Sequence, residues 1–296
     1  MKIYLLLSLL FISSIIYAQV PEDALRYSYY PQNGTARNLA IGGAMGSLGG
    51  DINATFVNPA GLGFYKTNEF VITPGFVLNN NKASFRGTGS KNNKSGFSFG
   101  PTGWVFGSTS YRNPKNSSAF SIAITQSANF NNETSYKGLN DYSSYGEQFA
   151  EEFAKSGLTI NEVLNSNSPY PYTSAPALYT YLIDTVTING VTQVKAAPEY
   201  ILDAGQALQQ EMLKSTKGGI YELAIGFAHN SNEKWYIGAT IGIPLINYES
   251  NTVFMESDTS ANTSNHFKQF TYTDNFKTKG TGGNVKIGII YRPKDY

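Results

Sequence analysis

Few residues of this chain have the types and spacing that catalysis requires. The sequence has no cysteine, and its two histidines, His229 and His266, are far apart along the chain. It contains neither a His-Glu-x-x-His sequence nor a Walker loop, so zinc-protease and nucleotide chemistry lack their usual residues. Glu147, Glu151 and Glu152 have the spacing of a solvated helix face instead of a catalytic pair. We therefore predict no enzymatic activity, no catalytic residue, no metal ion and no cofactor.

The composition limits the classes of protein to which the chain can belong. Its 296 residues carry a net charge of +1, which gives no reason to expect a nucleic-acid partner. Charged residues make up 15% of the chain, against about 25% in ordinary soluble domains. A secreted fold without disulfides needs another source of stability, and a closed β-barrel supplies it by pairing every strand edge.

The N-terminus has the features of an export signal. Lys2 precedes an apolar run from Ile3 to Ile16, and Ala18 provides a cleavage site. The alternative, a membrane-anchoring helix, needs about 20 apolar residues, and this run is shorter. No cysteine follows the cleavage point, which excludes a lipoprotein. We expect residues 1–18 to be a cleaved signal peptide.

Glycine is concentrated at the beginning of the mature chain, in residues 19–66. The spacing of Gly42, Gly43, Gly46, Gly49 and Gly50 has some likeness to a dinucleotide-binding loop, but no strand precedes it and no long helix follows. Glycine also lets a backbone approach a neighbouring surface closely. We therefore predict a compact, irregular segment that packs against the rest of the chain.

Later segments alternate bulky apolar residues with small or polar ones, which is the period of a β-strand. The clearest are residues 120–125, 221–228, 235–243 and 285–290, with less regular strands at residues 68–78 and 96–111. In a membrane barrel the bulky face would contact lipid. In a water-soluble sandwich the same face would form the core. The alternation by itself fits both architectures.

The lengths of the connections favour the barrel. Long links near residues 79–95, 131–218 and 250–265 alternate with short links near residues 112–117, 230–233 and 292–295. Outer-membrane barrels alternate in this way, with long loops outside and short turns in the periplasm. We predict an all-β fold, an antiparallel transmembrane β-barrel with about six recognisable strands at residues 67–130 and 219–296. Tyr221, Trp235, Tyr236 and Tyr291 would then lie near the membrane interfaces.

Residues 131–218 are predicted to form a partly helical extracellular insert. Ser144 and Glu147 have the spacing of a capping box, and Ser174 with Pro176 would open another short helix. A third helix is expected after Pro198, with an apolar stripe of Ile201, Ala204, Leu208 and Met212. Two interpretations stay open: a lid on the barrel mouth, or a surface that collects apolar ligands.

An ordered series of small motifs lies between Thr35 and Leu62. They are Ala36-Arg37, Gly42-Gly43-Ala44, Asp51 with Ala54, and Asn58-Pro59-Ala60-Gly61-Leu62. The series resembles the N-terminal segment of the FadL/TodX family of outer-membrane transporters of hydrophobic compounds. Tyr27 to Gly34 resembles the same segment in Bacteroidetes-type members. The close resemblance covers about 45 residues, and the rest of the chain is similar only in composition and alternation.

The resemblance implies a fold in which residues 19–66 form a hatch inside a 14-stranded barrel. Because about six strands are recognisable, the chain is expected to be the N-terminal portion of a longer barrel. Gly42, Gly43, Ala44 and Asp51 would pack the hatch, and residues 58–62 would lie where it shapes a ligand cavity. The hatch would be either a plug alone or a plug that also gates the ligand.

The resemblance also implies a function, the passive uptake of hydrophobic small molecules, with long-chain fatty acids as the best-known cargo. Some family members have been called haemin receptors, which would make His229 or His266 a haem ligand. Other barrels of this fold act in surface attachment or as secretion-shuttle components, and the Tyr-rich residues 131–218 would suit a protein partner. The expected location is the outer membrane, with membrane lipid as a partner. A soluble, adhesin-like sandwich is the remaining alternative.

Overall fold

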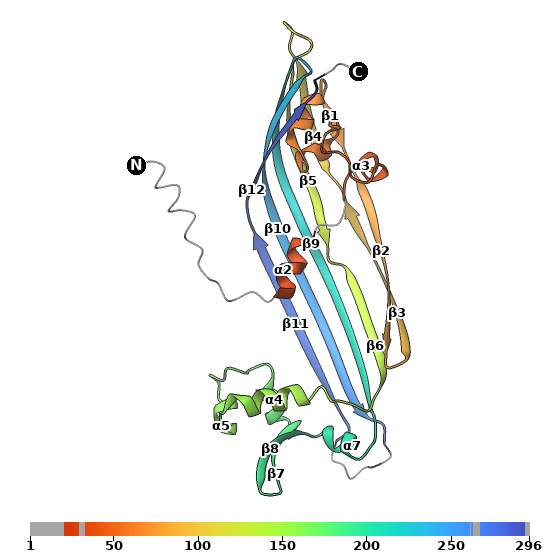
Figure 1. The fold of residues 1–296 in the computed structure, drawn as a ribbon, viewed down its shortest axis with the longest axis vertical. Coiled ribbons are helices and arrows are strands. Elements are labelled where there is room, and N and C mark those ends of the chain that lie inside the picture. The colour runs from red at the N-terminus through yellow and green to blue at the C-terminus, as the bar shows by residue number, and fades with distance from the viewer. Residues whose placement is uncertain (1–20, 30–32, 261, 263–266, 294–296) are drawn as a thin grey trace, which may run out of the picture.

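The computed structural model describes residues 21–29, 33–260, 262 and 267–293. Within them the predicted all-β class is confirmed, because the chain is mostly antiparallel β-sheet with a few short helices (Figure 1). The largest sheet is open, so the closed barrel stays a prediction. The expected signal peptide, residues 1–18, and His266 lie outside the described residues.

The main sheet is built on one very long hairpin. Its strands β9 and β10 pair over their whole lengths around a three-residue turn, residues 232–234, in which Asn232 and Glu233 both have positive φ. On the β9 side the sheet continues through β5 and β6, then β4 and β1, while β11 and β12 both pair with β10. The strands are β1 (Glu69–Val71), β4 (Thr102–Thr109), β5 (Ser117–Asn129), β6 (Asn132–Asn140), β9 (Leu208–Ser231), β10 (Trp235–Asp258), β11 (Gln269–Thr281) and β12 (Asn284–Tyr291).

The two faces of the main sheet differ in side-chain size. On β10 every second residue from Trp235 to Leu245 is exposed, and so are most of their bulky register partners on the neighbouring strands. We call this surface the outer band; it contains Phe70, Trp104, Phe106, Ile122, Ile124, Leu223, Ile225, Phe227, Trp235, Ile237, Ile241, Ile243, Leu245, Val285, Ile287, Ile289 and Tyr291. Small residues such as Ala224 and Gly238 occupy the opposite, concave face.

Residues 74–99 form a separate two-stranded sheet. Its strands β2 (Pro74–Phe85) and β3 (Thr88–Phe99) pair around Arg86 and Gly87, which both have positive φ. The long loop expected near residues 79–95 is therefore wrong. Much of this hairpin consists of asparagine, lysine and serine, so it has strand geometry without the apolar alternation by which strands are usually recognised.

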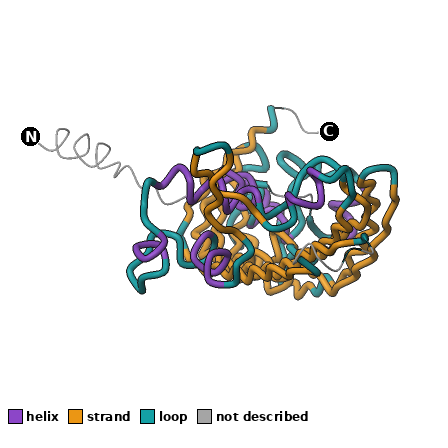
Figure 2. Tube along the Cα trace, turned by 90° about the horizontal axis from the view of Figure 1, so that it is seen from below, coloured by secondary structure: helices purple, strands orange, loops and turns teal. Residues whose placement is uncertain are grey.

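The N-terminal segment lies on the concave face of the main sheet. Its elements are α2 (Pro21–Ser28), α3 (Ala36–Ala40) and two 3-10 helices, η1 (Ile52–Thr55) and η2 (Pro59–Phe64). Figure 2 shows helices and loops inside the arc that the strands describe. The buried side chains of Ile52, Ala54 and Leu62 pack against Ala119 and Ala228 of the sheet. This segment therefore shares a core with the strands.

The insert lies at the other end of the sheet, away from the β9–β10 turn (Figure 1). It contains α4 (Glu147–Ser156), α5 (Ile160–Val163), α6 (Ser174–Tyr179), β7 (Ile183–Ile188), β8 (Val191–Ala196) and α7 (Glu199–Asp203). It has a core of its own around Phe149, Phe153 and Leu178. None of the helices in the described part of the chain is both long enough and apolar enough to cross a membrane.

The helices predicted at Glu147 and Ser174 are confirmed. The helix after Pro198 ends at Asp203, and its expected continuation to Met212 is wrong. Residue 208 already begins β9, because pairing with neighbouring strands outweighs a local helical pattern. Strands thus occupy both ends of the predicted insert, residues 131–218, and leave residues 141–207 for the insert itself.

Candidate functional site

The Asn58-Pro59-Ala60-Gly61-Leu62 motif forms the beginning of η2. The Asn58 side chain accepts a hydrogen bond from Ala60 N at 3.2 Å through Oδ1 and donates one to Gly46 O at 2.6 Å through Nδ2. Pro59 occupies the first helical position, where its fixed φ is suitable and no N–H is required. Ala60 and Leu62 are fully buried. The motif therefore starts η2 and joins it to the loop at Gly46.

Three glycines on the concave face make room for η2. A Cβ added at Gly238 of β10 would overlap the carbonyl group of Pro59, and one at Gly288 of β12 would overlap the side chain of Asn58. A Cβ at Gly226 of β9 would lie 2.8 Å from Cδ1 of Leu62. Only residues without a side chain let the strands approach another segment this closely. We call Gly226, Gly238 and Gly288 the glycine seat.

Tyr236 adds an aromatic contact beside the glycine seat. Its ring stacks on Phe64 at 4.1 Å between centroids, with 6° between the ring planes, and it is 2% exposed. The prediction that Tyr236 lies at a membrane interface is wrong, because alternate residues of a strand point to opposite faces and Tyr236 is on the concave one. Trp235 and Tyr291 do lie on the outer face, with 4.3 Å between their ring centroids.

Asp51 organises the first part of the N-terminal segment. Its Oδ1 accepts a hydrogen bond from Asn53 N at 2.8 Å, and its Oδ2 accepts one from the Thr35 hydroxyl at 2.7 Å. The first bond caps η1 and the second reaches the residue that precedes α3. One buried carboxylate thus fixes two short helices that could not form alone.

Gly42 and Ala44 do not have the packing role that was expected of them. Both are exposed, and a Cβ at Gly42 would meet no atom within 4 Å. Gly42 and Gly43 have positive φ, so their function is to form the turn after α3. The close contact within the segment is made by Gly49 and Gly61 instead.

A cavity of about 880 Å³ lies beside the N-terminal segment, between α2, α3 and the β2–β3 hairpin. We call it the hairpin cavity. Its apolar walls include Leu25, Leu39, Phe76, Phe99 and Phe130. None of these residues was predicted from the sequence, because four segments far apart in the chain meet to form the cavity.

The wall of the hairpin cavity also contains polar side chains, among them Arg26 and Gln126. Gln126 is 4% exposed, and among the described residues its Oε1 has no hydrogen-bond partner. Arg26 pairs with Asp23 and lies 4.2 Å from the centroid of the Tyr248 ring. Gln126 and Arg26 both line the cavity. Either side chain could bind a carboxyl group, because Arg26 donates to carboxylates and Gln126 would accept from a protonated acid.

The hairpin cavity lies where backbone pairing in the sheet stops. β4 pairs with β5, whereas β3 forms no ladder with β5 or β6, and β5 has an irregularity between Gln126 and Ala128. Side chains bridge part of this break: Asn79 Nδ2 donates to the carbonyl oxygen of Asn131 at 2.5 Å, and Asn92 Oδ1 accepts from Ser135 N at 3.0 Å. We call the break the sheet gap.

No family model, curated protein or solved structure matches this chain.

Within the described part of the chain, the other groups that could do chemistry are not assembled into a site. His229 is exposed on the outer face, with its Nδ1 2.9 Å from the Ser118 hydroxyl. Residues 96–100 have the Gly-x-Ser-x-Gly spacing of a hydrolase nucleophile, but Ser98 lies within β3 and not at a strand-to-helix turn. Across the described ranges, no three His, Asp or Glu side chains are grouped to hold a metal ion.

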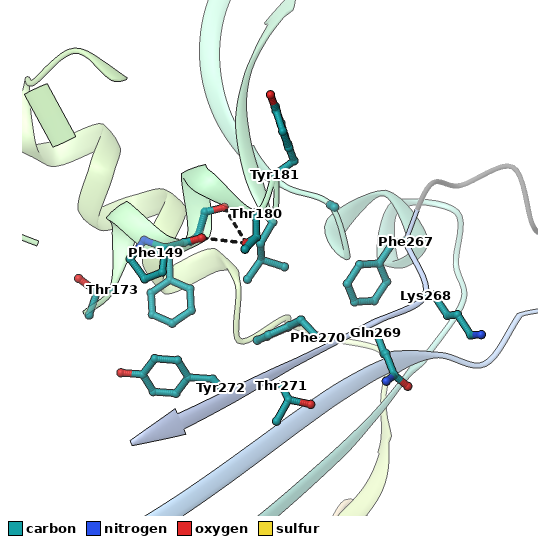
Figure 3. A pocket seen from close by; sticks show the side chains of 14 residues that line it. Phe149, Thr173, Thr180, Tyr181, Phe267, Lys268, Gln269, Phe270, Thr271 and Tyr272 are labelled. Carbon is teal, nitrogen blue, oxygen red and sulfur yellow. Dashed lines mark hydrogen bonds between the residues drawn. The ribbon is translucent and has the colours of Figure 1, made fainter. Parts of the chain in front are cut away.

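A second cavity, of about 430 Å³, lies between the insert and β11 (Figure 3). The rings of Phe149, from α4, and Tyr272, from β11, are 5.5 Å apart between centroids. Phe267 and Phe270 extend the aromatic wall, while Thr180 donates to the carbonyl oxygens of α6. This cavity marks the seam along which the insert rests on the sheet.

Proposed function

We propose that this chain is part of an outer-membrane β-barrel of the FadL/TodX type and takes part in the passive uptake of hydrophobic small molecules, long-chain fatty acids above all. The observation that carries the proposal is the division of the main sheet into two faces. The small-residue face is filled by the N-terminal segment, while the bulky outer band is exposed. A water-soluble sandwich would bury the bulky face instead.

The outer band has the dimensions of a membrane-spanning surface. At about 3.3 Å per residue, the stretch from Trp235 to Leu245 is about 33 Å long. A strand tilt of about 40° would reduce its height to about 25 Å, the height of the apolar band on outer-membrane barrels. Trp235 and Tyr291 form an aromatic pair at one border, where barrels carry aromatic girdles. Lipid chains are therefore the medium that would cover the band.

The hairpin cavity is the cargo site in this proposal. Its volume falls within the range of about 300–1,000 Å³ that small-molecule sites occupy. The apolar walls would hold an aliphatic chain, and Arg26 or Gln126 would hold its carboxyl group. The adjacent sheet gap would let a bound molecule leave toward lipid without crossing η2. The hatch would then act as a plug that also shapes the ligand site.

Filling the hairpin cavity is expected to weaken cargo binding. Ala36 of α3 lines the cavity, so Ala36→Trp should place an indole ring inside it. We expect the Kd of a fluorescent long-chain fatty acid for the detergent-solubilised protein to rise about tenfold, which corresponds to about 1.4 kcal/mol. Ala40→Trp, on the same helix but outside the lining, should bind as the wild type does. Equal affinity in the wild type and Ala36→Trp would remove the cavity from the proposal.

Removing the Arg26 guanidinium is expected to affect acids and alcohols differently. Arg26→Gln should weaken binding of a fatty acid about tenfold, because a charge-assisted hydrogen bond contributes about 1.5–3 kcal/mol. Binding of the fatty alcohol with the same chain should stay within about twofold of wild type. Arg37→Gln is the control, because Arg37 donates to Gly50 O outside this cavity. An equal loss for acid and alcohol would assign Arg26 a purely structural role.

A docking function for surface proteins is the second candidate, and one observation favours it. Tyr172, Tyr179 and Tyr181 of the insert are all exposed, and aromatic residues are enriched in protein interfaces. The cavity variant separates the two functions. In a docking protein, Ala36→Trp would leave partner recruitment intact and there would be no fatty-acid uptake to lose. In a transporter, uptake by the source bacterium would fall in Ala36→Trp and persist in Ala40→Trp.

A further inference from the structure

The outward face of the main sheet turns from apolar to charged just beyond the outer band. The band ends on β10 at Leu245, and the next outward positions are polar. Strand register places Lys217 of β9 and Lys277 of β11 on either side of Glu249 in β10. Lys279 of β11 lies one outward position nearer to the band. We call Lys217, Lys277, Lys279 and Glu249 the lysine belt.

Glu249 holds two lysines of the belt in place. Lys217 Nζ lies 2.7 Å from Glu249 Oε2, and Lys277 Nζ contacts the other carboxylate oxygen. The two ammonium groups lower the pKa of Glu249 to about 2, so the carboxylate is charged at any physiological pH. Three lysines and one glutamate leave the belt with a net positive charge. All three lysines are exposed.

We propose that the lysine belt binds the phosphate group of a membrane lipid whose chains lie on the outer band. This inference rests on the proposed insertion of the sheet in a membrane. Glu249 is four residues beyond Leu245, which is about 13 Å along the strand and corresponds to the headgroup layer just outside the hydrocarbon core. Lysine ammonium groups bind phosphate well. Because belt and band are continuous, one lipid molecule would contact both.

The charge of the belt also argues for a phosphate over a neutral headgroup. A sugar or alcohol headgroup needs hydrogen bonds but no net positive charge, whereas each lysine near an anionic lipid surface contributes about a fourfold to sixfold increase in binding. Lys137, the nearest comparable outward lysine on β6, is paired with its own partner, Glu211, at 2.8 Å. Lys137 and Met255 of β10 both pair with Glu211 of β9, so they lie at the same level of the sheet. This level is farther from the outer band than the lysine belt is. Lys137 therefore provides a matched control.

The test compares two lipids that differ only in the phosphate. The full chain in neutral detergent is mixed with phosphatidic acid or with diacylglycerol of the same acyl chains, and bound lipid is counted by native mass spectrometry. We expect the wild type to retain phosphatidic acid in preference to diacylglycerol. The variant Lys217→Gln/Lys277→Gln/Lys279→Gln should lose about tenfold or more of this retention. Glu249→Gln should increase it, because an acceptor that competes with phosphate is gone, and Lys137→Gln should leave it unchanged.

Several outcomes would overturn the inference. Equal retention of the two lipids, or unchanged retention in the triple variant, would show that the belt does not recognise lipid phosphate. Displacement of phosphatidic acid by millimolar inorganic phosphate would make it a site for free anions. Flotation of the same protein with phosphatidylcholine vesicles tests membrane insertion separately. Failure to float would overturn the proposed function and this inference together, whereas flotation without phosphate preference would overturn the inference alone.

Discussion

Replacing Gly238 with valine is expected to detach η2 from the concave face of the sheet. The added side chain would overlap the backbone of Pro59 and Ala60, which cannot rotate away as a flexible side chain can. Overpacking of this kind costs up to about 3 kcal/mol or more when the surroundings cannot relax. This contact joins η2 to the sheet. We therefore expect the lost stability to appear as local detachment of the plug from the concave face. Amide hydrogen exchange across residues 52–64 should become much faster in Gly238→Val.

The control for this prediction is the same substitution at another strand glycine. Gly89 lies on β3, and a Cβ there would meet no atom within 4 Å. Gly89→Val should leave exchange across residues 52–64 at the wild-type rate. If Gly238→Val also exchanges at that rate, the glycine seat does not hold the N-terminal segment. If the plug does detach, the fatty-acid affinity of Gly238→Val tests the role of the hatch. A protein whose plug shapes the ligand site should bind fatty acid more weakly once the plug has detached.

The strand segments at residues 120–125, 221–228, 235–243 and 285–290 could be predicted because each of them carries its bulky residues on one face. Ile237, Ile241 and Ile287, for example, all lie in the outer band, so the alternation in sequence is also an alternation in space. The turn at residues 230–233 could be placed for the same reason, since it interrupts two such runs. Whether the bulky face contacts lipid or forms a protein core was not predictable, because both environments produce the same alternation.

The errors have physical causes that a single sequence does not reveal. Tyr236 was placed at a membrane interface, although its side chain lies on the concave face. The alternation of residues along the strand determines which of the two faces a side chain occupies. Leu208 and Met212 have helical spacing, but the ladder with β10 determines their structure. The β2–β3 hairpin is polar along most of its length and therefore looked like a loop.

The candidate site was predictable only in its local part. Asn58 before Pro59 is a helix start that sequence chemistry can identify. The contact of Asn58 with Gly288 depends on packing between segments more than 200 residues apart, which spacing cannot give. The hairpin cavity is harder still, because Arg26 and Gln126 belong to different elements and line one cavity only through the tertiary fold.

A buried carboxylate fastens the insert to the sheet. Glu256 of β10 is fully buried and accepts hydrogen bonds from the Ser144 hydroxyl at 2.5 Å, from Tyr145 N at 3.0 Å and from Gln210 Nε2 at 2.7 Å. Ser144 and Tyr145 belong to the insert just before α4, and Gln210 belongs to β9. One side chain thus joins the insert to both strands of the long hairpin, well beyond the outer band.

Docking of the insert is expected to weaken as the pH rises. Burial raises the pKa of Glu256 above the ordinary value of 4.5, because desolvation disfavours the charged form more than the hydrogen bonds favour it. At a pH between the ordinary and the raised pKa, Glu256 keeps its proton in the docked state and loses it in the undocked state, where water solvates the carboxylate. Docking therefore loses stability as the pH increases through that range. Amide exchange of α4, corrected for the intrinsic pH effect, should accelerate in the wild type. It should show no such dependence in Glu256→Gln.

Glu256→Ala is expected to release the insert at every pH. The substitution leaves three buried donors without their acceptor, and each unsatisfied donor costs about 1–3 kcal/mol. We therefore expect rapid proteolysis within residues 147–203 while β9 and β10 stay protected. Glu151→Ala is the control, because this exposed residue of α4 pairs only with Lys155 among the residues that the structure describes. Resistance to the protease in Glu256→Ala would mean that the aromatic seam at Phe149 and Tyr272, and not the carboxylate, holds the insert on the sheet.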